Sequence, residues 1–393
     1  MKKMIKKDIK KVVLVAGFLG GIVGMAQAQT NVAIYGVIDL GMNYTNNVGG
    51  KNSVQMESGY AQGSRIGFQG NEDLGGGLSA LFQLENGFAA DTGKTGQGGL
   101  LFGRQALVGL SSKTAGTVTL GRQYDSVVDY LAPMTANGNW AGYLFSHPLD
   151  NDNTDNSFRI NNSIKYASPD FGGIKFGGLY GFGETAGNNA KNRAYSLGAS
   201  YANGPLSAGI GYLNLSAPGS TGAGNGSITP ADANFTGDTS TQKIFGAGIN
   251  YAFGATTLGF VYTNTNLTNP TGSTYIGTFT PAAGTLSSLK FNNYEINAKY
   301  QISEAFYVGA MYTYTQGKYD TTAGNAKPKW STLGLMADYN FSKRTDIYVQ
   351  GVYQKVGGDL TGTILDEAYV PGSAGSSGND KQAVIRLALR HQF

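Results

Sequence analysis

The sequence predicts an all-β fold, a transmembrane antiparallel β-barrel of 16 strands whose long third loop folds into the lumen. Three observations lead to this fold class. Apolar and polar residues alternate with a period of two through segments of about ten residues. The connections between these segments are alternately short and long, as in outer-membrane barrels. The chain also has 60 glycines and 24 tyrosines but only 14% charged residues, a composition that favours β structure.

The first predicted strand shows the alternation clearly. Within residues 31–44, Ile34 and Ile38 share an apolar face, whereas Asp39 and Asn43 share the opposite face. A strand tilted by about 45° crosses a bilayer with roughly 9 to 11 residues, which is the length of these segments. Because lipid offers the backbone no hydrogen-bond partners, such a sheet has to close on itself. The same alternation is found in residues 77–87, 117–123 and 383–393.

The connections give the number of strands. Seven short turns are expected at 71–77, 113–117, 168–173, 202–205, 253–255, 302–305 and 341–344. Eight longer connections are expected at 45–52, 89–100, 125–160, 185–191, 216–241, 267–289, 319–328 and 358–379. Fifteen connections join sixteen strands and place both termini at the short-turn end. A soluble β-sandwich would also alternate in polarity, but it gives no reason for regularly alternating connection lengths.

The energetic cost of charge in lipid assigns the two faces of the wall. A barrel of this size is too wide to be filled by its own side chains and encloses water. A charge on the lipid face costs about 2–4 kcal/mol near the bilayer midplane, so charged strand residues are expected to point inward. In the ambiguous segment 102–110, this cost favours Arg104, Ala106 and Val108 inward and Leu107 outward. The other charged residues expected inward are Asp39, Arg65, Glu85, Lys175, Glu295, Lys299 and Arg386.

Residues 1–28 have the features of a secretory signal peptide. Six lysines form a positively charged head before an apolar stretch, and Ala26–Gln27–Ala28 gives a small-x-small cleavage pattern. Removing these six lysines and one aspartate takes the net charge from +4 to −1. The barrel domain is therefore expected to span 29–393 and to have no basic patch for nucleic acid.

The longest connection, residues 125–160, is expected to fold into the barrel. A loop of this length is uncommon unless it is functional or disordered. Trp140, Tyr143 and Phe145 make it too apolar to extend freely into water, and the barrel interior is the available surface. An external cap or a contact between subunits is the alternative. The acidic candidates on this loop are Asp125, Asp129, Asp150, Asp152 and Asp155.

Basic residues of the early strands are candidates for the wall opposite the loop. They are Arg65, Arg104, Arg159 and Lys165, with Arg122 a weaker candidate because it shares the parity of apolar strand residues. Charges of opposite sign across a constriction would discriminate between anions and cations, as charged rings do in other pores. The alternative is that these arginines only neutralise the loop aspartates.

Several stretches resemble the Gram-negative general porins, closest to the Neisseria and Burkholderia type. They are VAIYGVIDLGMNY, GSRIGFQGNEDLGGGLSALFQLE, FGRQALVGLSSKTAGTVTLGRQYD, NNSIKYASPDFGG and the terminal LRHQF. The resemblance implies a homotrimer of 16-stranded barrels, with an inward third loop opposite an arginine cluster. Arg65 and Arg104 match basic residues of that cluster, and Arg159 looks like a third member. The resemblance also implies an integral outer-membrane protein with periplasmic termini, surrounded by lipid and lipopolysaccharide.

The chain ends in Phe393, which keeps the apolar alternation of its strand to the last residue. A terminal aromatic carboxylate on an alternating strand resembles the signal read by the barrel assembly machinery. The alternative is a residue of the aromatic girdle that flanks the apolar band of such barrels.

The predicted function is a water-filled channel for passive diffusion of ions and small hydrophilic solutes, with a mild preference for anions. An enzyme is not expected, because His147 and His391 are the only histidines and no catalytic set is seen. No cofactor or metal is expected. A plugged transporter would need a globular domain before the first strand. A substrate-specific channel for sugars or organic anions is the closest alternative, since tyrosine and tryptophan in the long loop could stack on sugar rings.

Overall fold

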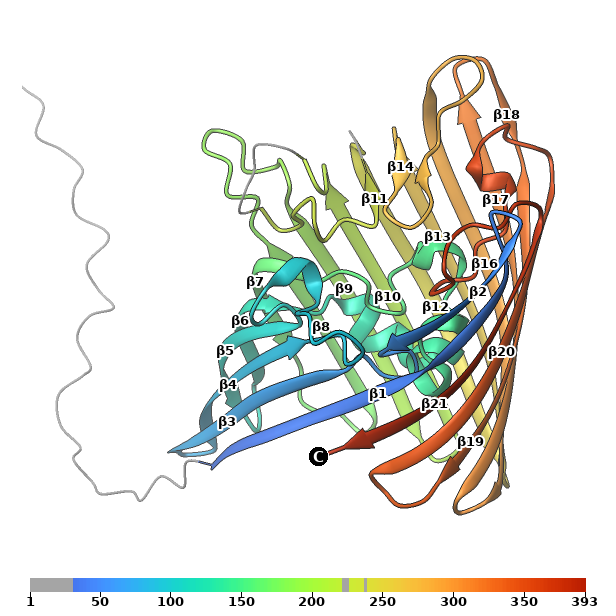
Figure 1. The fold of residues 1–393 in the computed structure, drawn as a ribbon. Helices are drawn as coiled ribbons and strands as arrows, with labels where there is room; N and C mark the ends of the chain where they lie inside the picture. Colours follow the sequence, from blue (N-terminus) through green and yellow to red (C-terminus); the bar gives the residue numbers. More distant parts are fainter. Residues whose placement is uncertain (1–30, 221–225, 237–238) are drawn as a thin grey trace, which may run out of the picture.

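The computed structural model describes residues 31–220, 226–236 and 239–393. They form a closed β-barrel with short turns at one end and longer loops at the other (Figure 1). The predicted signal peptide, residues 1–28, lies outside the described residues. No helix in these three ranges is long and apolar enough to cross a membrane.

The barrel wall is one antiparallel sheet. Its strands are β1 (Asn31–Val48), β2 (Lys51–Ser58), β3 (Arg65–Gly75), β4 (Leu78–Gly87), β5 (Gln105–Ser112), β6 (Gly116–Gln123), β7 (Ile160–Ala167), β8 (Ile174–Gly181), β9 (Ala194–Asn203), β10 (Leu206–Ser216), β12 (Thr241–Phe253), β13 (Thr256–Thr268), β16 (Leu286–Ser303), β17 (Phe306–Thr321), β18 (Gly324–Ala326), β19 (Pro328–Asn340), β20 (Thr345–Gly358) and β21 (Lys381–Gln392). β2 and β3 both pair with β1, and β18 and β19 both pair with β17, so each pair forms one barrel strand. The 18 labelled strands therefore make the predicted wall of 16.

Three short strands lie in the longer connections, outside the wall. β11 (Phe235–Thr236), β14 (Gly272–Ser273) and β15 (Gly277–Thr278) form a small sheet of their own. The 3-10 helices η1 (Gln97–Gly99) and η7 (Ile364–Asp366) also lie in connections between wall strands.

The barrel closes between its first and last strands. Residues 37–45 of β1 pair with residues 384–392 of β21. Beyond this ladder, the backbone N–H of Phe393 donates to the Gly36 carbonyl at 3.1 Å, and Gly36 donates back at the same distance. The last residue is therefore tied into the seam at the short-turn end of the barrel (Figure 1).

The outer surface of the wall is apolar and its inner surface is polar, as the alternation predicts. Leu197 and Ile210 are 64% and 51% exposed on the outer face. Lys175 lies on the face opposite to the exposed Ile174. The most buried of the charged residues expected inward are Asp39, Glu85, Glu295 and Arg386, each at most 3% exposed.

The expected faces of segment 102–110 are wrong in part. Val108 is 57% exposed and pairs with the exposed Leu120, so it faces outward. Leu107 pairs with Gln83, whose amide donates to an inward tyrosine, so Leu107 faces inward. The reason is that β5 begins at Gln105, one residue after Arg104. The inward arginine therefore says nothing about the parity of the strand that follows it.

Two of the connections expected to be long are tight turns. β1 continues to Val48 and turns back through Gly49 and Gly50, both of which have positive φ. β17 likewise continues to Thr321 and pairs with β18 after a two-residue turn. Both hairpins lengthen strands of the wall at the long-loop end (Figure 1). The polar residues that were expected in loops there belong to strands instead.

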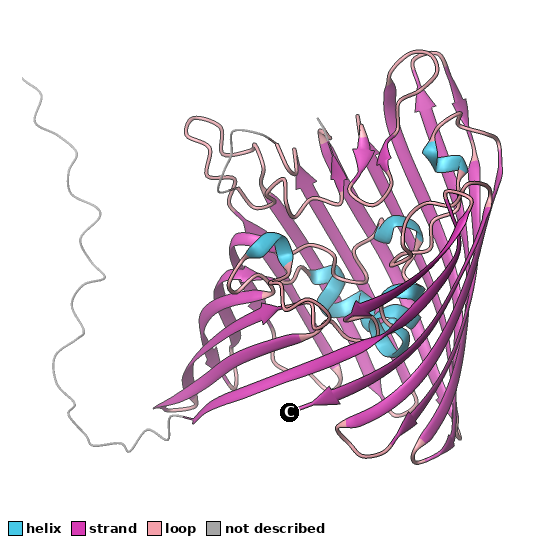
Figure 2. Cartoon of the chain, in the orientation of Figure 1, coloured by secondary structure: helices cyan, strands magenta, loops and turns pink. Residues whose placement is uncertain are grey.

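The segment between β6 and β7 is the long loop, and its helical turns lie inside the ring of strands (Figure 2). These turns are η2 (Val127–Leu131), η3 (Ala132–Met134), η4 (Asn137–Ala141), η5 (Tyr143–Phe145) and η6 (Pro148–Asp150). Glycines on the inner face of the wall leave room for them. A Cβ at Gly309 would lie 2.5 Å from the Trp140 ring, and one at Gly334 would lie 2.4 Å from the Phe145 ring. The loop therefore packs directly on the inner backbone surface of the distant strands β17 and β19.

Candidate functional site

Two of the predicted arginines share one carboxylate on strands β3 to β7, which we call the early wall. Arg104 Nε lies 2.7 Å from Glu85 Oε1, and Arg65 Nε lies 3.6 Å from Glu85 Oε2. Glu85 also accepts a 2.8 Å hydrogen bond from the Tyr35 hydroxyl. Arg65 belongs to β3 and Arg104 directly precedes β5, and both of these strands pair with β4, which carries Glu85 between them. One carboxylate therefore faces two positive charges.

Arg159 joins this group through Tyr124. The Arg159 guanidinium carbon lies 5.6 Å from the centre of the Tyr124 ring, and the Tyr124 hydroxyl accepts a 3.0 Å hydrogen bond from Arg104. Arg159 is 4% exposed, and its Nε has no hydrogen-bond partner. Burial, followed by the neighbouring charge of Arg104, lowers the pKa of Arg159 to about 10. We call Arg65, Arg104 and Arg159 the arginine cluster.

Lys165 lies beside the arginine cluster, but an acidic residue neutralises its charge. Its Nζ donates to the Tyr124 carbonyl at 3.1 Å and contacts Asp129 at 2.7 Å. Asp129 belongs to the first helical turn of the inner loop, η2. The Lys165–Asp129 pair therefore ties the start of the loop to β7.

Of the acidic candidates, Asp155 is the one whose carboxyl interacts electrostatically with Arg159 and Arg104 of the arginine cluster. Burial, followed by the carboxylate of Asp150, raises the pKa of Asp155 well above its usual range, and Arg159 and Arg104 oppose that shift. The Asp155 carboxyl is therefore a weaker acid than that of an exposed aspartate.

Two further candidates, Asp125 and Asp150, turn back into the loop itself. Asp150 accepts hydrogen bonds from the backbone N–H of Asp155 at 3.0 Å and from the Ser157 hydroxyl at 2.6 Å. Asp125 accepts from the Val127 N–H at 2.7 Å and from the Asn153 amide at 2.8 Å. Both carboxyl groups are fully buried, and burial raises the pKa of each to about 6. These two carboxyl groups stabilise the conformation of the loop and do not lie on its surface.

Asp152 belongs to a buried contact that pins the loop to the far wall. The two ring nitrogens of His147 lie 2.5 Å from Asp152 Oδ2 and 3.1 Å from Glu295 Oε2. Asp152 also accepts a hydrogen bond from the Thr263 hydroxyl, and Glu295 accepts one from the Ala136 N–H at 2.8 Å. All three ionisable groups are fully buried. We call His147, Asp152 and Glu295 the loop anchor.

The sequence did not single out three groups that the structure places in these sites. Glu85 was assigned inward from its parity, but its two arginine partners depend on strand register. Tyr124 carries no signal of its own beyond its position after β6. Asp232, in the connection before β12, pairs with Arg122 at 2.7 Å, so Arg122 is neutralised outside the arginine cluster.

The described part of the chain contains no group of three or more histidine, cysteine, aspartate or glutamate residues that could hold a metal ion. Three guanidinium groups, Arg65, Arg104 and Arg159, thus outnumber the two acidic groups near them, Glu85 and Asp155, between the loop and strands β3 to β7.

A family model for Gram-negative porins matches residues 13–359. This chain belongs to the Gram-negative porin family. The porin is 31% identical to an outer membrane porin protein of Bordetella pertussis, over 98% of its own length and all of the relative. It is 28% identical to outer membrane porin protein 32 of Delftia acidovorans, over 94% and 96% of the two chains.

Comparison with solved structures agrees with this assignment. An anion-selective porin from Comamonas acidovorans superposes with a TM-score of 0.70 at 26% identity, over 93% of this porin and all of that chain. Porins are channels rather than enzymes. This porin is an integral β-barrel of the outer membrane.

Proposed function

We propose that this porin forms a water-filled channel for passive diffusion of ions and small hydrophilic solutes, with a mild preference for anions. The observation that carries the proposal is the arginine cluster, in which Arg65 and Arg104 share one carboxylate, Glu85, and Arg159 lies against the Tyr124 ring. Four of the five candidate loop aspartates are neutralised or turned away, so they do not cancel this charge. The similar Comamonas acidovorans porin, whose name describes it as anion-selective, supports the same direction.

Replacing Arg65 and Arg104 with glutamine is expected to shift the reversal potential towards cations in planar bilayers with a salt gradient. A unit charge at about 4 Å interacts by about 1 kcal/mol in water and more at lower dielectric. Because about 1.4 kcal/mol corresponds to a factor of ten, the anion-to-cation permeability ratio should fall by about three- to tenfold. A matched control is Lys94→Gln with Lys113→Gln, which removes the same charge from exposed positions. If both double variants kept the wild-type reversal potential, the arginine cluster would be structural only.

We further propose that the porin is a homotrimer in lipid and lipopolysaccharide. The outer face of β1 and β2 supports an extended contact, since Ile34, Met42, Val54 and Met56 are each at least 55% exposed. Unheated samples should run as a heat-labile oligomer on denaturing gels, and bilayer conductance should rise in groups of three steps. Migration as a monomer at every temperature would contradict the trimer.

We also propose that residues 1–28 are removed on export and that Phe393 is read by the barrel assembly machinery. Phe393 is 45% exposed, and its ring covers Gly36 on the outer face of the seam. The aromatic end is therefore held at the short-turn rim, where a girdle residue would also lie.

A further inference from the structure

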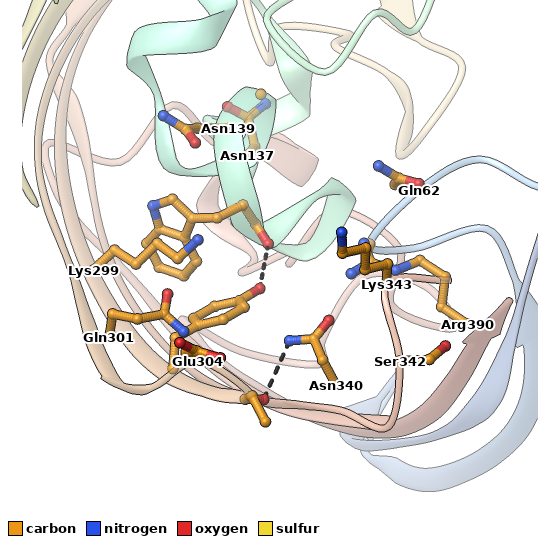
Figure 3. A pocket seen from close by; sticks show the side chains of 15 residues that line it. Gln62, Asn137, Asn139, Lys299, Gln301, Glu304, Asn340, Ser342, Lys343 and Arg390 are labelled. Carbon is orange, nitrogen blue, oxygen red and sulfur yellow. Dashed lines mark hydrogen bonds between the residues drawn. The ribbon is translucent and has the colours of Figure 1, made fainter. Parts of the chain in front are cut away.

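A polar pocket lies in the barrel below the inner loop, on the side of the short turns (Figure 3). Its volume is about 670 Å³. The turn between β16 and β17 and the turn between β19 and β20 form its floor, and η4 of the inner loop forms its roof. The residues that matter for its chemistry are Gln62, Asn139, Lys299, Glu304, Lys343 and Arg390.

The pocket adjoins the arginine cluster through one short segment. Residues 59–64 interrupt the second barrel strand between β2 and β3. Within this segment Gln62 lines the pocket, whereas the Gly63 carbonyl accepts a hydrogen bond from Arg65 at 3.0 Å. A Cβ at Gly63 would also lie 2.7 Å from the Arg104 guanidinium. This segment therefore joins the pocket to the arginine cluster.

Two lysines of the pocket have no acidic partner. Lys299 Nζ lies 4.1 Å from the centre of the Tyr307 ring. In the described part of the chain, no carboxylate lies within 4 Å of the ammonium group of Lys299 or Lys343. The two side chains extend into the pocket from opposite sides (Figure 3). Two positive charges are therefore available to a solute.

The other two charged residues of the pocket are one paired arginine and one carboxylate. Arg390 contacts Asp346 at 2.9 Å and Asp338 at 3.4 Å, so its guanidinium is already paired. Glu304, on the β16–β17 turn, is the one carboxylate among the lining residues. The solute-accessible charges are thus two ammonium groups and one carboxylate. Ammonium groups without a counter-ion gain most from an oxyanion.

We propose that this pocket is a second anion-binding site, in which Lys299 and Lys343 hold small solutes that carry a carboxylate or phosphate group. The inference rests on the proposed channel function and adds to it a binding step on the periplasmic side of the arginine cluster. Anions then pass from three guanidinium groups to two ammonium groups within one lumen. The amide groups of Gln62 and Asn139 supply further hydrogen bonds at the edge of the pocket.

The absence of cysteine from the chain allows a direct test in the full-length porin. Ser342→Cys places a thiol on the pocket floor, and Thr114→Cys places one on an exposed turn outside the pocket as a control. Each variant is reacted with a negatively charged and a positively charged methanethiosulfonate reagent. The ratio of the two rates reports the local potential. The reactions are repeated with citrate, with inorganic phosphate and with maltose at matched ionic strength.

The negative reagent should react faster than the positive one at the thiol introduced at position 342, and citrate or phosphate should slow the reaction. Adding Lys299→Gln and Lys343→Gln should reduce the rate ratio by about threefold or more and abolish this protection. Protection by citrate alone assigns carboxylate solutes, and protection by phosphate assigns phosphate solutes. Protection by maltose alone, or a rate ratio unchanged by the lysine variants, would overturn the proposal.

This result is independent of the channel's overall selectivity. If the reversal potential of the wild type showed no anion preference, the anion preference proposed from the arginine cluster would be wrong. If the anion preference were present but citrate and phosphate left the thiol unprotected, the second site alone would fail. Lys94→Gln with Lys113→Gln removes the same charge from exposed positions outside the pocket and should leave the rate ratio at position 342 unchanged.

Discussion

Replacing His147 with alanine is expected to release the inner loop from the far wall. The two ring nitrogens of His147 face Asp152 and Glu295, and these two carboxylates raise its pKa to about 10, which favours the imidazolium ion at neutral pH. Its removal would leave two fully buried carboxylates without a counter-ion. Breaking a buried ion pair in this way costs about 3–5 kcal/mol. The loop should therefore open far more often.

Chymotrypsin provides the measurement, because Tyr143, Leu144 and Phe145 are protected within the barrel. Since about 1.4 kcal/mol is a factor of ten, cleavage of the loop in His147→Ala should be faster by on the order of a hundredfold or more. Glu295→Gln keeps the size of the side chain but removes one charge, and should give a smaller increase. Asn139→Ala, at an exposed position of the same loop, is the control. Wild-type protection of His147→Ala would show that apolar packing alone holds the loop.

The loop anchor also predicts how protection depends on pH. Burial lowers the pKa of His147, but Asp152 and Glu295 outweigh it and raise the value to about 10. The stabilisation of the loop by protonated His147 is therefore complete below the unfolded pKa of about 6.5 and is lost as pH rises towards 10. Burial would raise the pKa of Asp152, but His147 holds it below the usual range. That contribution is present above about pH 3.9 and is lost at lower pH. Protection of the loop from chymotrypsin should therefore be greatest between about pH 3.9 and pH 6.5. The cleavage rate is normalised to that of a peptide substrate at each pH.

Replacing Arg386 with glutamine is expected to weaken the seam at which the barrel closes. Arg386 is fully buried and contacts Asp39 at 2.9 Å across the β1–β21 ladder. Its guanidinium also lies 4.2 Å from the centre of the Tyr60 ring. Without it, Asp39 would be a buried charge that retains only hydrogen bonds, such as the 2.7 Å bond from Tyr348. The free energy of unfolding should fall by about 3–5 kcal/mol.

The midpoint of urea unfolding, followed by the heat-dependent shift in gel mobility, measures this loss. Arg344→Gln removes the same charge from the exposed turn between β19 and β20 and should leave the midpoint unchanged. Asp39→Asn combined with Arg386→Gln should recover part of the loss, because no unpaired buried charge remains. A midpoint equal to that of Arg344→Gln would show that backbone pairing alone maintains the seam.

Strand residues show how far local pattern extends. The inward positions of Asp39, Glu85 and Arg386 follow from a period of two, which depends only on neighbours along the chain. The pattern fails at Arg104 and Val108, because parity has meaning only where the backbone is already in a strand. Where a strand begins is decided by hydrogen bonds to another strand. The sequence of segment 102–110 does not contain that information.

The inner loop shows where local pattern ends. Its apolar residues predict that it packs on something, and its aspartates predict charge. Which aspartates face the lumen depends on contacts with residues far along the chain. Asp152 is occupied by His147 and Thr263, and Asp129 by Lys165, so neither contributes free charge at the arginine cluster.

By itself, the sequence determined the barrel class, the number of strands and the inward charges, since these follow from alternation, connection length and the cost of charge in lipid. The tertiary structure alone decided that Glu85 joins two arginines, that His147 links the loop to Glu295, and that Lys299 and Lys343 share a pocket. The physical reason is range. Alternation is a property of adjacent residues, whereas a charge acts on whatever group the folded barrel brings within a few ångströms.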